Sequence, residues 1–94
     1  MSFEWDDRKD ARNRRKHGVS FAEAQTVFFD EHALLIADPE HSGQEERFVL
    51  LGLSSALRAL VVCHCYRQGA VVRIVSARNA NRQERAQYER RWIK

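Results

Sequence analysis

The chain has 94 residues, and this length predicts a single domain over residues 1–94 with one modest hydrophobic core. Hydrophobic residues make up 44% and charged residues 31%, a balance typical of a folded globular protein. The longest apolar run, around residues 60–63, is too short to cross a bilayer, and residues 1–6 lack the basic and then apolar order of a signal peptide. We therefore expect a cytoplasmic protein with no membrane partner.

Charge is segregated along the chain, although the formal net charge is only +3. Residues 8–16 contain six basic side chains and one acid, and residues 67–94 contain eight basic side chains and two acids. Residues 30–46 contain six acids and no Lys or Arg. Two basic segments, rich in Arg, favour an anionic partner such as nucleic acid, because the guanidinium group matches phosphate. The alternative is two solvated helix faces.

The first elements are predicted as a short strand and two helices. Residues 3–5 alternate in polarity like a strand, and Asp6 or Asp7 can cap a helix that runs to about Lys16 and ends at Gly18. That helix has almost no apolar stripe, so we expect it to be exposed or covered by a partner. Ser20 and Glu23 match a capping box that opens a second helix to about Phe29. Its apolar face consists of Phe21, Ala24 and Phe28.

The second half is predicted as a run of strands and a final helix. The strands cover residues 32–37, 47–53, 59–66 and 70–76, joined by an exposed loop at 38–43 and turns at 54–58 and 67–69. Residues 59–66 are nearly all apolar and predict a central strand. Asn79 or Asn81 can cap a helix to about Trp92, with Glu84, Tyr88 and Trp92 along one side. The fold class is therefore α+β: a small antiparallel sheet of three to four strands, with two N-terminal helices and one C-terminal helix.

The two cysteines and the histidine between them do not predict a metal site. Cys63 and Cys65 share one face of a strand, whereas His64 points to the other, so the three cannot close a tetrahedral zinc site. The two cysteines are also poorly placed for a disulfide, and we expect reduced core thiols. No glycine-rich phosphate loop or nucleophile elbow is present. We expect neither a metal nor another cofactor.

Five short motifs, in chain order, resemble those of the BrnT toxins of type II toxin–antitoxin systems. They are Lys16-His17-Gly18-Val19-Ser20-Phe21, Glu45-Glu46-Arg47-Phe48, His64-Cys65-Tyr66-Arg67, Arg73-Ile74-Val75-Ser76-Ala77-Arg78, and Glu84-Arg85 with Tyr88. The resemblance implies a fold like that of RelE-type ribonucleases and a toxin that cleaves RNA, inhibits translation and halts growth. It also implies a cognate, BrnA-like antitoxin with a ribbon-helix-helix domain, through which the complex reaches operator DNA.

Metal-independent RNA cleavage needs a base, an acid and several cations on one surface. The base takes the proton of the ribose 2′-OH, the acid protonates the leaving oxygen, and the cations stabilise the phosphorane. His64 is the first candidate for proton transfer because histidine titrates near neutral pH; a satisfied, half-buried imidazole is the alternative. Tyr88 is a second candidate, as a proton donor or a stacking surface, although its ring could equally be packed.

Arginines supply the candidate phosphate contacts. Arg73 interrupts an apolar strand and therefore points to solvent or to a site, and Arg78 precedes a helix N-terminus, which also favours anions. Arg47 opens a strand beside two glutamates, so a surface ion pair is its alternative. We predict His64, Arg47, Arg73, Arg78 and Tyr88 as catalytic residues and Arg67, Arg82 and Arg85 as RNA-binding residues. His17 is interpreted as a partner of the helix dipole, and His32 and His41 are assigned no role.

Three functions remain open on these residues alone. The first is an endoribonuclease toxin that uses the residues above. The second is a non-catalytic module that binds RNA or DNA through the same arginines. The third is a protein-interaction domain whose basic helices bind an acidic partner. Cleavage of RNA in EDTA separates the first from the second.

Overall fold

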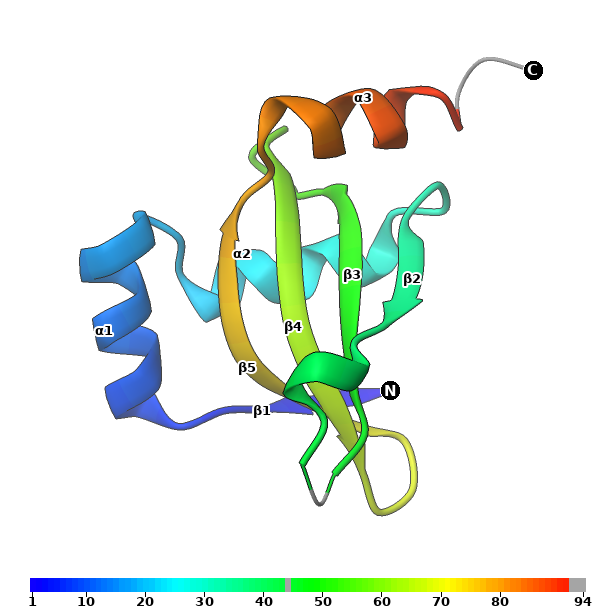
Figure 1. Cartoon of the computed structure of the whole chain (residues 1–94). Coiled ribbons are helices and arrows are strands. Elements are labelled where there is room, and N and C mark those ends of the chain that lie inside the picture. Colours follow the sequence, from blue (N-terminus) through cyan, green and yellow to red (C-terminus); the bar gives the residue numbers. More distant parts are fainter. Residues whose placement is uncertain (44, 92–94) are drawn as a thin grey trace.

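The structure, a computed structural model, describes residues 1–43 and 45–91 and consists of a sheet with helices on either side (Figure 1). In chain order its elements are β1 (Ser2–Glu4), α1 (Asp7–His17), α2 (Phe21–Thr26), the 3₁₀ helix η1 (Val27–Phe29), β2 (Leu34–Ala37), the 3₁₀ helix η2 (Pro39–His41), β3 (Arg47–Leu53), β4 (Ala59–Arg67), β5 (Val71–Asn79) and α3 (Arg82–Glu89). The predicted α+β class is confirmed. Trp92, where the last helix was expected to end, lies outside the described residues.

The sheet has five strands in the order β1-β5-β4-β3-β2, so it exceeds the predicted three to four strands by one. Strands β2 to β5 pair antiparallel, as predicted, and β4 is the central strand. The additional strand is β1, which pairs parallel with β5 at one edge, Ser2 beside Val71 and Glu4 beside Arg73. A strand of three residues carries little periodicity, and its partner lies at the far end of the sequence, so this pairing was not predicted.

The hydrophobic core lies between α2 and one face of the sheet. Ten buried residues form it: Val19, Phe21, Ala24, Val27, Leu50, Leu60, Val62, Val72, Ile74 and Ala77. The second helix therefore packs as predicted, although its last turn is the 3₁₀ helix η1. On the opposite face, α3 covers one end of the sheet, where Tyr88 packs with Leu51, Val61 and Ala80 (Figure 1).

Local caps determine where the helices begin and end. Asp6 accepts hydrogen bonds from the N–H groups of Arg8 and Lys9 at 2.7 and 3.2 Å, and Gly18 ends α1 in the left-handed conformation at φ 69°. Asn81 and Glu84 cap α3 reciprocally. Of the capping box predicted for α2, only the bond from the Glu23 N–H to Ser20 Oγ forms.

The remaining helix, α1, lies beside β5 and packs on it without an apolar stripe. Its buried side chain is the polar Asn13, which hydrogen-bonds to the main chain at Val19 and Ala77. The prediction of a helix that is polar nearly all round is therefore right, but one of its polar groups is a structural contact. Among the described residues, no helix is long and apolar enough to span a membrane.

Candidate active site

Four of the predicted arginines project from the same face of the sheet, the face opposite α2. Arg47 pairs with Cys65 and Cys65 with Arg73, and residues directly opposite one another share a face. Arg67 lies two residues after Cys65 on β4, and Arg78 pairs with Val61, which is four residues before Cys65. Strand alternation therefore places all four guanidinium groups on one side of the sheet.

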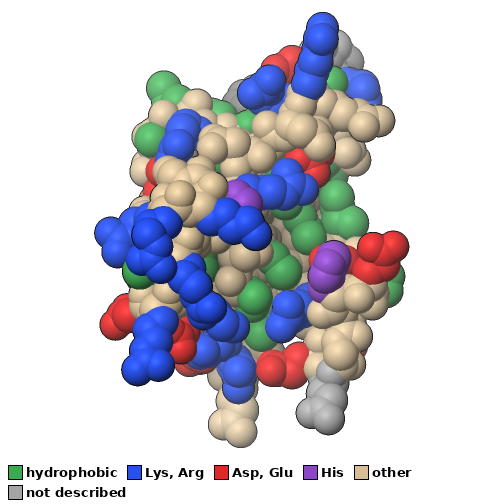
Figure 2. All heavy atoms as spheres, turned by 60° about the vertical axis from the view of Figure 1, so that its left-hand side comes forward, with side chains coloured by type: hydrophobic (Ala, Val, Ile, Leu, Met, Phe, Trp, Pro, Cys, Tyr) green, Lys and Arg blue, Asp and Glu red, His purple; other side chains and the backbone are tan. Residues whose placement is uncertain are grey.

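A pocket of about 220 Å³ opens on this face. Figure 2 shows Lys and Arg side chains gathered around a hollow with a hydrophobic floor. The pocket is lined by His17 at the end of α1, by Asp38 and His41 around η2, by Arg47 and Val49 of β3, by Val61 and Cys63 of β4, and by Ser76, Ala77 and Arg78 of β5. Residues from five elements of the chain thus meet here.

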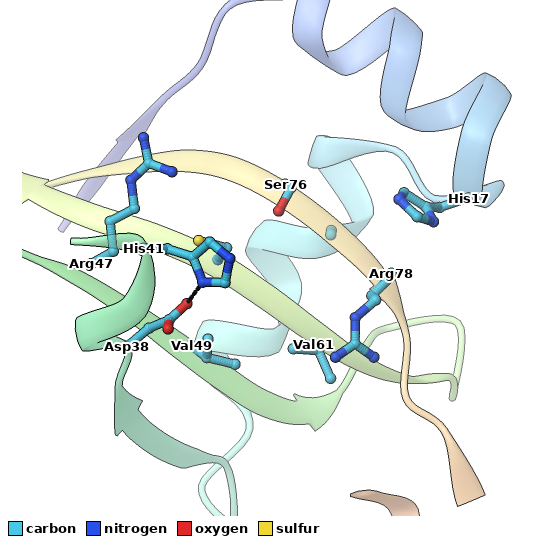
Figure 3. A pocket seen from close by; sticks show the side chains of 10 residues that line it. His17, Asp38, His41, Arg47, Val49, Val61, Ser76 and Arg78 are labelled. Atoms are coloured by element: carbon cyan, nitrogen blue, oxygen red, sulfur yellow. Dashed lines mark hydrogen bonds and ion pairs between the residues drawn. The ribbon is translucent and has the colours of Figure 1, made fainter. Parts of the chain in front are cut away.

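The pocket holds one imidazole and one guanidinium near each end. Figure 3 shows His41 and Arg47 on one side and His17 and Arg78 on the other, with Ser76 between them. The two histidines reach the pocket from outside the sheet, His17 as the last residue of α1 and His41 as the last residue of η2. This arrangement combines imidazoles, the side chains most often used for acid–base catalysis, with permanent cations.

The imidazole of His41 is oriented by a carboxylate. Asp38 Oδ2 lies 2.9 Å from His41 Nδ1, so Nδ1 donates to the carboxylate and Nε2 is left available. The loop that carries the pair is tied to the start of β3, because Asp38 N–H donates to the Arg47 carbonyl at 2.9 Å and Ser42 Oγ accepts from Arg47 N–H at 2.8 Å. The segment 38–43 is largely exposed, as predicted, but its residues Pro39–His41 form η2 at the edge of the pocket.

The two pocket arginines differ in their ion pairing. Arg78 makes a bidentate pair with Glu84 of α3, at 2.8 and 2.9 Å, which raises the pKa of the guanidinium and lowers that of the carboxyl. The pair holds Arg78 in place at the rim of the pocket. Arg47 has no salt bridge with any residue in the described part of the chain, so its charge remains available for an anion.

Comparison with models of known protein families identifies the family of this chain. Residues 5–84 match the family model of BrnT, the ribonuclease toxin of type II toxin–antitoxin systems. This chain belongs to the BrnT family. It is therefore a ribonuclease toxin, with RNA as its substrate and an antitoxin as its partner.

A solved structure supports the fold of this BrnT-family chain. The crystal structure of the Brucella abortus ribonuclease toxin BrnT superimposes with a TM-score of 0.69 and 21% sequence identity, over 87% of this chain and 99% of that chain. A search of curated protein sequences finds no match. The similarity to RelE-type ribonucleases stays a prediction.

His64, the first candidate for proton transfer, lies outside the pocket in this BrnT-family chain. It is completely buried on the core face, with Nδ1 3.1 Å from the Val62 carbonyl and Nε2 3.2 Å from the Tyr66 hydroxyl. Phe28 packs edge-on against its ring at 4.8 Å. Burial lowers the pKa of His64, although the bond to Val62 opposes the shift, and so favours the neutral form. The structure therefore corresponds to the alternative of a satisfied core imidazole.

Tyr88 likewise lies in packing and not in the pocket. Its ring is buried, and its hydroxyl donates to Asp30 Oδ2 at 2.6 Å, which joins α3 to the segment after η1. Burial raises the pKa of Asp30, but hydrogen bonds from Tyr88, Leu53 N–H and His32 N–H outweigh it, so the pKa is lower than usual. The tyrosine thus stabilises an ionised carboxylate.

The remaining predicted arginines do not line the pocket. Arg73 pairs with Glu4 at 2.8 Å, and Arg67 lies 3.5 Å from Glu45. Arg82 and Arg85 are exposed on α3. Of the eight predicted site residues, the pocket brings together Arg47 and Arg78.

Sequence reasoning missed three pocket residues: His17, Asp38 and His41. The spacing of Asp38 and His41, three residues apart around a proline, is the signal that could have identified their pairing in one helical turn. For His17 the available signal was its position immediately before the glycine that ends α1, which supports a helix-dipole role equally well.

Proposed function

We propose that the pocket is the RNA-cleaving centre of this toxin and that it works without a metal ion, with His17 and His41 as the proton-transfer pair. The observation that carries the proposal is the placement of one imidazole and one guanidinium near each end of a single pocket. Within the described part of the chain, no group of three His, Cys, Asp or Glu side chains is arranged to hold a metal ion.

The proposed reaction is an internal transesterification. One imidazole takes the proton of the ribose 2′-OH, and the 2′-oxygen forms a bond to the adjacent phosphorus. The bond from phosphorus to the 5′-oxygen breaks, and the other imidazole donates its proton to that leaving oxygen. The products are a 2′,3′-cyclic phosphate end and a free 5′-OH end, so atoms and charge balance.

Each neighbouring residue has a part in this scheme. Asp38 holds His41 by Nδ1, which orients the ring and stabilises its protonated form. Arg47 and Arg78 stabilise the negative charge that grows on the phosphoryl oxygens. Arg67 and Arg73, on the same face, are proposed to contact flanking phosphates, and Arg82 and Arg85 remain predicted RNA contacts on α3.

The test is cleavage of RNA by the purified toxin, without antitoxin, in the presence of EDTA. We expect full activity and 2′,3′-cyclic phosphate ends. We expect His17→Ala and His41→Ala each to lower kcat by about 10²-fold or more, which is the usual scale of acid–base catalysis. Arg47→Ala is expected to lower kcat by about 10²-fold, because it removes a cation that stabilises the transition state.

Matched controls are available outside the pocket. His32→Ala and Arg90→Ala remove the same groups from positions that do not line it, and should leave kcat within about twofold, as is usual for surface changes away from a site. A requirement for a divalent metal, or wild-type rates in both histidine variants, contradicts the proposal. Binding of RNA without cleavage indicates the non-catalytic alternative.

Family membership supports a proposal about the role of the toxin in the cell. We propose a cytoplasmic toxin that inhibits translation and growth and is neutralised by a BrnA-like antitoxin, whose ribbon-helix-helix domain connects the complex to operator DNA. Induced expression with and without the neighbouring antitoxin gene tests this: growth should stop only in its absence. Unchanged growth in both cases argues against a toxin.

A further inference from the structure

A second hollow lies beside the pocket, between α1 and β5. It measures about 260 Å³ and is lined by Lys9, Arg12, Asn13, Lys16, His17, Val75 and Ser76. Two of these residues, His17 and Ser76, also line the pocket, so the two hollows adjoin. We call the second hollow the α1 groove.

The charge of the α1 groove comes from one face of the helix. Lys9, Arg12 and Lys16 are spaced i, i+3 and i+7, which puts them on the same side over about 10 Å of helix axis. None of the three forms a salt bridge within residues 1–43 and 45–91. By contrast, Arg67, Arg73 and Arg78 of the sheet face each have a carboxylate partner.

The spacing of these charges opposes helix stability, although Lys16, in the last turn, also interacts favourably with the helix dipole. Lys9 with Arg12, and Arg12 with Lys16, are like-charge pairs at i, i+3 and i, i+4, which destabilise a helix by about 0.2–0.5 kcal/mol each. Cations also line a hollow on another face of α1, formed by Arg8, Arg12 and Arg15, so the α1 groove is distinguished by its continuity with the pocket. Because the groove adjoins the pocket in which we propose RNA cleavage, an extended polyanion accounts for the pattern.

We propose that the α1 groove binds the phosphate backbone of the substrate RNA on one side of the scissile bond, and that this RNA enters as a single strand. The inference rests on the proposed function of the pocket and extends it to the flanking nucleotides. Hollows of this size admit one strand. The groove lining contains no Phe, Tyr or Trp side chain and three cations, so its contacts fall mainly on phosphates and give affinity with little sequence preference.

An acidic protein segment is the competing occupant. A protein-docking surface has a hydrophobic centre with aromatic or aliphatic anchors, whereas Val75 is the one such side chain in the lining of the α1 groove. The shared residues His17 and Ser76 place the groove on the path of an RNA strand bound in the pocket as proposed above. Both observations favour RNA.

The test uses two triple variants of the full-length toxin. Lys9→Gln with Arg12→Gln and Lys16→Gln removes the groove cations. Arg8→Gln with Arg14→Gln and Arg15→Gln removes the same charge from other faces of the same helix and serves as the control. Glutamine is a good helix former, and matching far-UV circular dichroism and Tm confirm that both variants are folded.

Binding is measured by fluorescence anisotropy with a 2′-O-methyl RNA of about 12 nucleotides, a length within the range of single-strand-binding sites. This RNA lacks the 2′-OH and cannot be cleaved. We expect the groove variant to bind this RNA at least tenfold more weakly than wild type. The magnitude of the slope of log K against log salt concentration should also fall by about 2, because each of the three lost phosphate contacts on a single strand reduces that slope by about 0.7. The control should lose less than about 0.7 of slope.

Equal losses in the two variants, or no loss in the groove variant, overturn the proposal. So does a groove variant that binds the RNA like wild type but no longer binds the antitoxin, because the groove is then a protein-docking surface. Since the binding assay involves no turnover, its result is independent of whether the pocket is the nuclease centre. If the pocket does cleave, the groove variant should raise KM for the corresponding cleavable RNA and preserve kcat.

Discussion

The side chain of Asn13 satisfies both main-chain polar groups of Ala77. Its Nδ2 donates to the Ala77 carbonyl at 2.8 Å, and its Oδ1 accepts from the Ala77 N–H at 3.1 Å. The same Nδ2 also donates to the Val19 carbonyl at 2.8 Å. Asn13 therefore attaches α1 to β5 one residue from Arg78, and it sets the position of His17 one turn later in the helix.

We expect Asn13→Ala to lower the free energy of unfolding by about 3 kcal/mol, because it leaves several buried backbone groups without partners. Urea unfolding measures the effect. Asn79→Ala, at an exposed position on β5, is the matched control and should change stability by less than about 0.5 kcal/mol. Wild-type stability in Asn13→Ala would show that α1 is held by other contacts.

Tyr88→Phe separates a structural from a catalytic role for this hydroxyl. The variant loses a hydrogen bond to a charged carboxylate, so we expect its free energy of unfolding to be about 2 kcal/mol lower than that of wild type. Because Tyr88 does not line the pocket, kcat per folded molecule should stay within about twofold of wild type. The reverse result, a large loss of kcat at unchanged stability, would return Tyr88 to the catalytic residues.

Asp38→Asn tests the orientation of His41. The amide keeps the shape of the carboxylate but cannot stabilise a protonated imidazole, so kcat should fall by about tenfold or more while KM changes little. The split between kcat and KM is the diagnostic readout, since a loosened loop would affect both. Glu40→Gln, an exposed change in the same turn, is the control and should leave kcat at the wild-type level.

The burial of His64 predicts a loss of stability at mildly acidic pH. Its pKa is lowered in the folded state, so as pH falls below about 6.5 the unfolded chain takes up a proton that the folded protein does not. The contribution of neutral His64 to the free energy of unfolding is fully present above the pKa that His64 has in the unfolded chain. It is lost as pH falls toward the lower pKa of the folded state, by at most about 1.4 kcal/mol per pH unit.

Unfolding in urea between pH 7.5 and 5 measures this slope, over a range that brackets the ordinary histidine pKa of about 6.5. His64→Gln should be less stable at pH 7.5 and should show a flatter pH dependence than wild type. His32→Gln, at a half-exposed position, should keep the steeper dependence. An unchanged slope in His64→Gln would assign the pH dependence to other groups.

The elements that sequence reasoning located correctly depend on interactions within a few residues. Asp6 and Gly18 bound α1, and Asn81 begins α3, through contacts that close within one helical turn. The central position of β4 follows from its continuous apolar run. The short strand β1 was placed nearly correctly, but its parallel partner β5 is some seventy positions away and has no local signal.

The candidate site was only half predictable, and a bulge in β5 shows why. Arg73 and Arg78 are five residues apart, so regular alternation would put them on opposite faces of the sheet. The pairing shifts between Cys63 opposite Ser76 and His64 opposite Ile74, which inserts Val75 as an extra residue and returns both arginines to one face. No feature of residues 71–79 alone indicates this shift.

The sequence by itself determined the family, the ends of the helices and the presence of many basic side chains. These features depend on residue types and on residues close together in the sequence, as helix caps, strand alternation and charge do. Only the tertiary structure decided which of four histidines enter the pocket. His17 and His41 are separated by two helical segments and a strand along the chain, and they meet because α1 and η2 fold against the same face of the sheet. His64 lies on the other face because alternation along β4 places it opposite Cys63 and Cys65, and the tertiary structure decided that this face carries the core, where Phe28 packs on the imidazole.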